Sequence, residues 1–195
     1  MKNMFNAKLL TASVVIGLSM ASVPAGAEVF HDFVVDESSV EGNGGTFTAD
    51  KINGNYAEVV TFGLGTFNTV AHGTFTSYQQ NEGVDNVNGI FLNAPELAGG
   101  YGIYTLFDGA GTFVDNGGGN ADFTFTSASF NMYIDPNQDT TKTLPGSAPG
   151  AVALGNIVDD YLVGSASMLS AGSGQLVAGI GGFFDLVFDD FALTG

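Results

Sequence analysis

The feature that most constrains the fold of this sequence is an alternation of apolar and polar residues with a period of two, in runs divided by glycine. Residues 29–36 show it, and the runs 46–50, 56–62 and 66–78 repeat it. Such alternation is typical of β-strands with one buried face. Glycine provides 29 of the 195 residues, about twice its usual share, so we expect many tight turns. The Asn53-Gly54 pair predicts one of them.

The middle of the chain predicts a long hairpin. Residues 101–114 and 121–135 form two apolar-rich runs, joined by a segment rich in Asp, Asn and Gly at 115–120. In the second run, the large apolar residues before residue 127 have odd numbers and those after it have even numbers. The buried face must therefore switch near residues 127–129, and we predict a β-bulge or a bend there.

The C-terminal part is predicted to continue as strands. Residues 154–162 also fit a helical spacing, but their β-branched content and flanking glycines favour a strand that begins near Asp160. We expect a turn at Gly172-Ser173-Gly174. The last run, 183–193, predicts a strand with Phe184, Leu186 and Phe188 on its buried face.

These patterns predict an all-β fold, an antiparallel two-sheet sandwich that is jelly-roll-like and forms a single domain over residues 28–195. The 17 phenylalanines supply apolar volume for one core. The sequence has no cysteine, so stability must come from burial or from bound ions. The chain ends on core-like residues, so we expect that more chain follows in the natural protein.

The first 27 residues have the three parts of a secretory signal peptide. Lys2 and Lys8 form the basic start, residues 9–23 form the apolar run, and Ala25-Gly26-Ala27 is a small-x-small cleavage site. The apolar run has about 15 residues, fewer than the roughly 20 that a membrane-spanning helix requires, which favours cleavage over an uncleaved anchor. We therefore expect a bacterial protein that is secreted and works outside the cell or on its outer surface.

The charge balance is strongly acidic, because 20 Asp and Glu stand against four basic residues, for a net charge of −16. All four basic residues are lysines and the signal peptide contains two of them, so the mature part carries −18. Such a surface repels nucleic acid and anionic membranes and attracts divalent cations. The alternative is that the acidity serves only solubility.

No pattern for a hydrolytic active site is found in the sequence. A serine nucleophile requires a base, but the only histidines are His31 and His72, and no Gly-x-Ser-x-Gly elbow occurs. We interpret both histidines as structural, and two isolated histidines do not make a zinc site. The pairs Asp159-Asp160 and Asp189-Asp190 offer carboxylates, as a glycoside hydrolase needs, but neighbours on a strand point to opposite faces. We expect no enzymatic activity.

The strongest ligand pattern is the segment 135–141, in which oxygen-bearing side chains alternate along the chain. A loop that wraps one hard cation such as Ca2+ needs this alternation. The candidate metal ligands are Asp135, Asn137, Asp139 and Thr141. The segment departs from an EF-hand, because Thr140 stands where the usual glycine would be and a proline lies inside. The alternative is a turn that ends a strand.

Two further groups of residues are weaker candidates. An oxygen-rich cluster that we interpret as turn chemistry consists of Asp115, Asn116, Asn120 and Asp122. Rings that could stack on sugars belong to Tyr101, Tyr104 and Tyr133. Aromatic residues in strands usually pack in the core or across strands instead.

Three segments, 33–37, 48–54 and 182–188, together with the export signal, carry a resemblance to a known family. The chain resembles the flocculation-associated PEP-CTERM proteins, which are secreted by floc-forming bacteria that produce exopolysaccharide. The resemblance implies a role in the matrix or at the cell surface. The Pro-Glu-Pro motif, membrane helix and basic cluster of that family are not in these 195 residues. The resemblance therefore requires that a sorting segment follows Gly195.

We expect a secreted, non-catalytic matrix or cell-surface protein that takes part in flocculation or biofilm aggregation. Its contacts with exopolysaccharide, or with its own copies, would be bridged by cations. The first alternative is a carbohydrate-binding module that acts without matrix assembly, which binding of glycans by the isolated monomer would favour. The second is a glycoside hydrolase, which requires two carboxylates that face one cleft.

Overall fold

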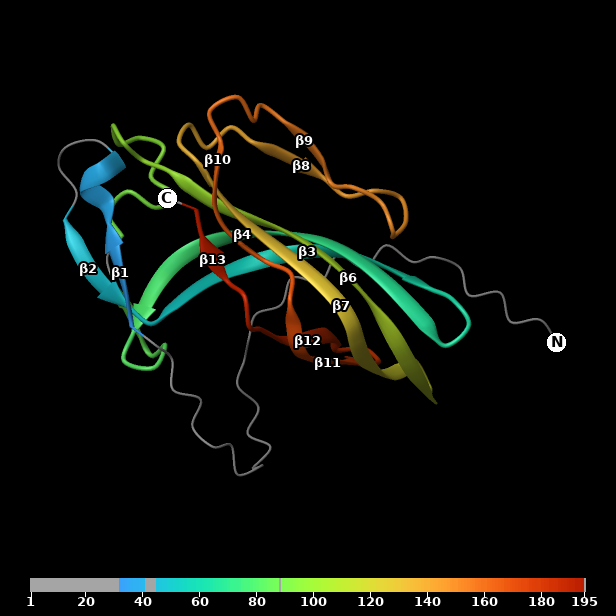
Figure 1. Cartoon of the computed structure of the whole chain (residues 1–195). Helices are drawn as coiled ribbons and strands as arrows, with labels where there is room; N and C mark the ends of the chain where they lie inside the picture. The colour runs from blue at the N-terminus through green and yellow to red at the C-terminus, as the bar shows by residue number, and fades with distance from the viewer. Residues whose placement is uncertain (1–31, 41–44, 88, 195) are drawn as a thin grey trace.

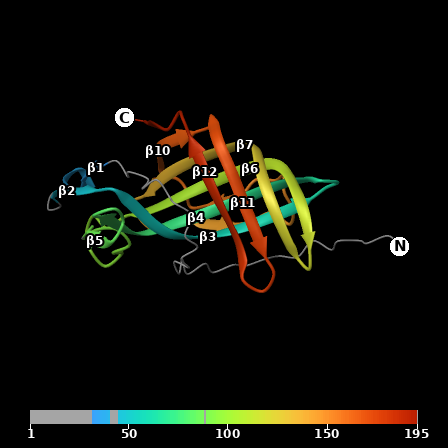
Figure 2. The same cartoon turned by 90° about the horizontal axis from the view of Figure 1, so that it is seen from below.

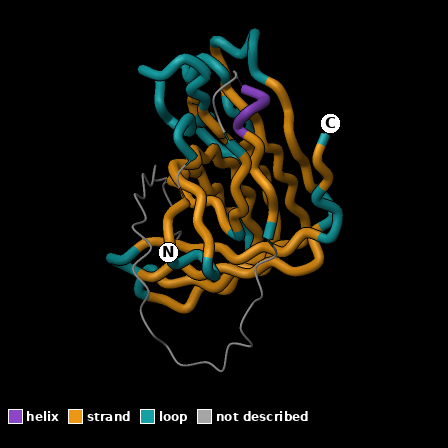
Figure 3. The backbone as a smooth tube through the Cα atoms, turned by 90° about the vertical axis from the view of Figure 1, so that its left-hand side faces the viewer, coloured by secondary structure: helices purple, strands orange, loops and turns teal. Residues whose placement is uncertain are grey.

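The computed structural model describes residues 32–40, 45–87 and 89–194. The predicted signal peptide and His31 lie outside these residues. The described chain consists of strands and loops, with one short 3₁₀ turn, η1 (Glu37–Val40), drawn in purple in Figure 3. In the described part, no helix has the length and apolar character that crossing a membrane would require. The prediction of an all-β sandwich of antiparallel strands is confirmed.

The strands, in chain order, are β1 (Phe33–Asp36), β2 (Thr46–Ala49), β3 (Lys51–Phe62), β4 (Thr66–Gln80), β5 (Asp85–Val87), β6 (Gly102–Gly117), β7 (Asn120–Asp135), β8 (Thr141–Thr143), β9 (Ala153–Gly155), β10 (Tyr161–Ala166), β11 (Leu169–Val177), β12 (Gly181–Phe188) and β13 (Ala192–Leu193).

Nine of these strands form one sheet. Six follow the path β12-β11-β7-β6-β4-β3, and three lie off it: β10 pairs with β7, β13 with β10, and β5 with β4. The long strand β7 pairs with β11 at its beginning, over Ala121–Thr124, and with β10 at its end, over Phe130–Ile134. The strands β1 and β2, and the strands β8 and β9, form separate hairpins. Because β7 has different partners at its two ends, the sheet bends, and β11 and β12 lie across the central strands when seen from below (Figure 2).

The predicted long hairpin is the pair β6 and β7, and its bulge lies close to the predicted place. The register shifts between Ala110 and Gly111, where Thr126 is the extra residue of β7. The hydroxyl of Thr126 donates to the carbonyl oxygen of Ala110 at 3.2 Å. The bulge is one residue before the predicted segment 127–129, and it keeps the phenylalanines on both sides of it on the same face.

We call the face of the central strands that carries Phe67, Phe107, Phe123 and Phe125 the lower face. Phe67 is 1 % exposed, and its ring centroid lies 5.0 Å from that of Phe123 and 4.9 Å from that of Phe125, edge to face. Phe184 of β12 packs onto Phe125 at 5.0 Å. Burial of these rings, in the geometry that aromatic pairs prefer, makes the lower face the main core.

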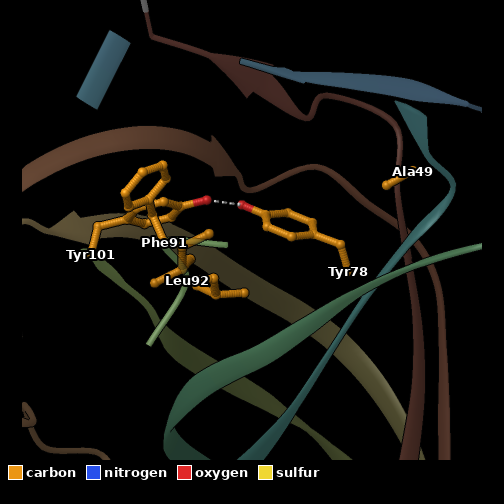
Figure 4. Packing of buried hydrophobic residues seen from close by; sticks show 6 residues of the cluster. Ala49, Tyr78, Phe91, Leu92 and Tyr101 are labelled. Atoms are coloured by element: carbon orange, nitrogen blue, oxygen red, sulfur yellow. Dashed lines mark hydrogen bonds between the residues drawn. The ribbon is translucent and has the colours of Figure 1, made fainter. Parts of the chain in front are cut away.

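A second core cluster lies where the β1–β2 hairpin meets the sheet, and it encloses a carboxylate. The hydroxyls of Tyr78 and Tyr101 are 3.0 Å apart (Figure 4). Tyr101 also donates to Glu37 Oε1 at 2.9 Å, and the backbone N–H of Ile90 donates to Glu37 Oε2 at 3.2 Å. Glu37 is 2 % exposed, so these hydrogen bonds replace its water. Burial raises the pKa of Tyr78 to about 12.

Two predicted turns are wrong, and both involve glycine. Asn53 and Gly54 lie inside β3, opposite a register shift in its pairing with β4. The predicted turn at 172–174 lies inside β11, and the chain turns at 178–180 instead. A Cβ on Gly174 would lie 2.2 Å from the ring of Phe184. Glycine is present there because a ring packs against the strand, and no turn is needed.

The opposite face of the central strands, which we call the upper face, carries His72, Tyr104, Tyr133 and Asp135. The rings of Tyr104 and Tyr133 are stacked, with centroids 5.0 Å apart. The β8–β9 hairpin lies above this face (Figure 1). The strand predicted to begin near Asp160 is β10, which begins at Tyr161. The upper face and the start of β10 together position the candidate site.

Candidate metal centre

Three carboxylates meet at the end of the upper face. Asp135 is the last residue of β7, and Asp159 and Asp160 lie in the bend that precedes β10. One carboxylate oxygen from each residue can be chosen so that all three lie within 4.8 Å of one another. We call these three residues the acidic triad. It brings together two segments that are far apart in the sequence, because β10 pairs with the end of β7.

Asp135 is held by the turn that follows it. Its side chain is 4 % exposed and accepts hydrogen bonds from the backbone N–H groups of Asp139, at 3.3 Å, and Thr140, at 3.0 Å. Gln138 has a φ of 56°, which lets the chain turn back toward β7. A side chain that caps its own turn in this way has a fixed orientation.

The other two carboxylates leave buried oxygens without a hydrogen-bond partner. Asp160 Oδ2 accepts from the hydroxyl of Tyr104 at 2.6 Å and from that of Thr140 at 2.8 Å. Asp160 Oδ1 and Asp159 Oδ2 are buried, and the described residues offer no donor to either. Buried polar atoms are nearly always paired, and an unpaired buried carboxylate oxygen is costly. Two such atoms in one cluster point to a ligand that supplies positive charge.

The nearest lysine does not neutralise the triad. Lys142 Nζ lies 4.8 Å from the centroid of the Tyr104 ring and donates to the Thr140 carbonyl oxygen at 3.4 Å. Within the described residues it forms no direct ion pair with the triad. Burial lowers the pKa of Lys142, and the charges of Asp135 and Asp160 oppose that effect. Burial, and then the hydrogen bond to Asp160, raise the pKa of Tyr104.

The donor set fits a hard divalent cation. All three ligands are carboxylates, without histidine or cysteine, and oxygen ligands of this kind select Ca2+ or Mg2+ over zinc. Two oxygens that each lie about 2.4 Å from one Ca2+ are at most about 4.8 Å apart, which agrees with the spacing of the triad. The hydroxyl of Thr140 lies next to the same carboxylates.

The structure brings only one of the four predicted ligands to the triad. Asp135 is there, whereas Asn137, Asp139 and Thr141 are exposed. The carbonyl oxygen of Asp139, and not its carboxylate, makes the local contact, by accepting from Asn156 Nδ2 at 3.1 Å. Between β7 and β8 the chain forms a turn that the Asp135 side chain caps. That a cation is bound near Asp135 remains a prediction.

Asp159 and Asp160 were missed for a physical reason. The sequence argument placed them on a strand, where neighbours point to opposite faces, but they lie in a bend just before β10. In a bend, successive side chains can converge. The available signal was the predicted start of the strand near Asp160, which put the pair at a strand end and not inside a strand.

The weaker candidates have structural roles in the described chain. In the β6–β7 turn, Asn116 Nδ2 donates to Asp122 at 2.8 Å and the N–H of Gly117 donates to Asp115 at 2.8 Å, which is turn chemistry. Tyr101 and Tyr104 are each 2 % exposed, so their rings are not accessible for stacking on a sugar. His72 lies on the upper face, where burial and then the charge of Lys142 lower its pKa.

Comparisons with family models, with curated proteins and with solved structures found no match for this chain.

Proposed function

We propose that this chain is a secreted, non-catalytic protein of the extracellular matrix or cell surface that takes part in flocculation or biofilm aggregation. It binds divalent cations and makes cation-bridged contacts with exopolysaccharide. The observation that carries the proposal is the acidic triad with its two buried, unpartnered carboxylate oxygens. The acidic composition and the export signal support it.

Two kinds of carboxylate would share the work. The acidic triad combines the buried Asp135 with two half-buried carboxylates and is preorganised, so it holds a cation within the domain. Exposed carboxylates can share further cations with anionic groups of a polysaccharide, each weakly, because water and salt screen them. Those with exposed side chains include Asp115, Asp122, Asp139, Asp185 and Asp189. The rigid β-scaffold presents them on a surface that otherwise repels polyanions.

Terbium luminescence tests the cation site directly. Tb3+ substitutes for Ca2+ and emits when a nearby tyrosine is excited, and the Tyr104 hydroxyl lies 2.6 Å from Asp160 Oδ2. We expect sensitised emission that Ca2+ displaces. Tyr104→Phe should remove most of the emission while Ca2+ still binds. Asp159→Asn should weaken binding, whereas the matched control Asp139→Asn, with the same charge change at an exposed position, should not.

The matrix role needs its own test. The full chain would be sedimented with exopolysaccharide from a floc-forming bacterium, in Ca2+ and in EDTA. We expect retention with the polysaccharide in Ca2+ and release in EDTA. Absence of Tb3+ binding would refute the cation site, and equal sedimentation in Ca2+ and EDTA would refute cation bridging.

A further inference from the structure

The acidic triad closes the base of a long excursion of the chain. The chain leaves the sheet after Asp135, forms the β8–β9 hairpin, and rejoins the sheet at β10, directly after Asp159 and Asp160. One carboxylate of the triad therefore lies where the chain leaves the sheet, which we call the exit side, and two lie where it rejoins the sheet, the return side. Figure 1 shows the hairpin above the central strands, with β10 descending from it.

The hairpin is held to the upper face by contacts other than strand pairing. The strands β8 and β9 pair only with each other among the described strands, and neither core cluster includes a residue between 136 and 158. The contacts to the sheet include Lys142 over the Tyr104 ring, at 4.8 Å, and the backbone N–H of Ala148, which donates to Thr61 Oγ1 at 2.8 Å, and Ala148 is itself 4 % exposed. Val59 and Val70 on the upper face are 7 % and 1 % exposed, so opening of the hairpin costs the burial of a small apolar patch but breaks no strand pairing with the sheet.

The base of the excursion is its strongest connection, but the charges there repel. The hydroxyl of Thr140, on the exit side, donates to Asp160 on the return side at 2.8 Å. Asn156 Nδ2 also donates to the Asp139 carbonyl oxygen at 3.1 Å, and the Tyr104 hydroxyl donates to Asp160 at 2.6 Å. Against these bonds stand three carboxylates, each with an oxygen within 4.8 Å of the others. Like charges this close destabilise the closed state unless a cation lies between them.

We propose that a divalent cation at the acidic triad clips the two ends of the excursion together, so that the β8–β9 hairpin is a cation-dependent flap over the upper face. This inference rests on the cation site of the proposed function and adds what the cation controls. Ile134 already pairs with Tyr161 at the base of the excursion, so the cation acts by fixing the turn after Asp135 against the bend before β10, which removes the entropy of the open states of the hairpin. Loss of the cation frees the hairpin while both cores remain packed.

Opening of the flap can be measured by trypsin cleavage at a single peptide bond, the one after Lys142. All basic residues of the chain are lysines, and Lys51 and Lys142 are those in the described part. Lys142 lies in β8, within the flap, and Lys51 lies in β3, in the main sheet. The full chain would be digested in Ca2+ and in EDTA, and the fragment beginning at Thr143 would be followed by mass spectrometry. We expect cleavage after Lys142 to be about tenfold or more faster in EDTA, because cleavage follows the open population, with Lys51 unchanged.

Two variants complete the test. Asp159→Asn should be cleaved after Lys142 at the EDTA rate even in Ca2+, whereas Asp139→Asn should keep the protection. Equal acceleration at Lys51 and Lys142 in EDTA would mean global unfolding and would overturn the flap. Terbium binding without any change at Lys142 would overturn the flap and leave the cation site intact. Absence of terbium binding would overturn both.

Discussion

The two faces of the central strands are stabilised by different physics. On the lower face, rings from four strands pack edge to face around Phe67, and the covering hairpin β11–β12 is itself part of the sheet. On the upper face, the covering hairpin β8–β9 is a separate sheet, and beside a small buried apolar patch that includes Val59 and Val70 it has polar contacts and the acidic triad at its base. One cover is held by burial, which needs no ligand. The other depends in addition on charge, which a ligand can change.

The largest expected effect tests the lower face. Phe67→Ala removes the ring that contacts both Phe123 and Phe125. A buried phenylalanine truncated to alanine costs about 3–5 kcal/mol of unfolding free energy, from lost transfer and from the cavity. Denaturant unfolding should show this loss equally in Ca2+ and in EDTA. A loss that depended on the cation would mean that the two faces are not independent.

The next effect concerns a polar contact inside the second core cluster. Glu37→Ala leaves the Tyr101 hydroxyl and the N–H of Ile90 without their acceptor. We expect a loss of about 3 kcal/mol, since each buried unsatisfied donor costs about 1–3 kcal/mol. Glu37→Gln keeps an acceptor and the volume, so chemical denaturation should show a smaller loss. Equal losses in both variants would mean that the charge, and not the hydrogen bonding, matters.

The stabilisation by a bound cation is expected to be close in size to the effect of Glu37→Ala, and to arise at the upper face. A ligand at 100 times its dissociation constant stabilises the folded state by about 2.7 kcal/mol. The melting temperature of the wild type should therefore rise with Ca2+ concentration and reach a plateau. Asp159→Asn should lose this dependence, and Asp139→Asn should retain it. A Ca2+-dependent rise in Asp159→Asn as large as in the wild type would place the cation elsewhere.

The lower face was largely predictable from the sequence because its signal is local. The period-two runs identified the β6–β7 hairpin, and the change of parity in the second run predicted the bulge now seen at Thr126. Phe184 and Leu186 were assigned correctly to the buried face of the last strand. The alternation of apolar and polar residues along one strand shows which side chains are buried, even when the neighbouring strand is not known.

The upper face was not predictable because its signal is long-range. Asp135 and Asp160 meet only through the pairing of β7 with β10, which no local pattern encodes. Gly172 and Gly174 were misread for the same reason. Glycine signals a turn when the chain is considered alone, but here it makes room for the side chains of Phe125, Leu186 and Phe184, which come from other strands.

The smallest expected effect comes from an ionisable carboxyl group that lies on the otherwise apolar lower face. Glu58 of β3 shares that face with Phe67, and its Oε1 accepts a hydrogen bond from the hydroxyl of Thr69. Burial raises the pKa of Glu58 from an ordinary 4.5 to about 7, although the Thr69 hydrogen bond opposes this. The folded state therefore holds the proton more tightly than the unfolded chain does.

The sign of the resulting pH dependence follows from that difference. The stability that protonated Glu58 contributes is fully present below about pH 4.5 and is lost as the pH rises through about 7. We expect a loss on the order of 1–2 kcal/mol, because a partly solvated side chain realises only part of the 1.36 kcal/mol per pKa unit. Denaturant unfolding of wild type and Glu58→Gln, both without added cation, isolates this term because all other groups titrate alike. If the difference between the two proteins stayed constant from pH 4.5 to 8, Glu58 would be solvated in the folded state, and the lower face would not be closed over β3.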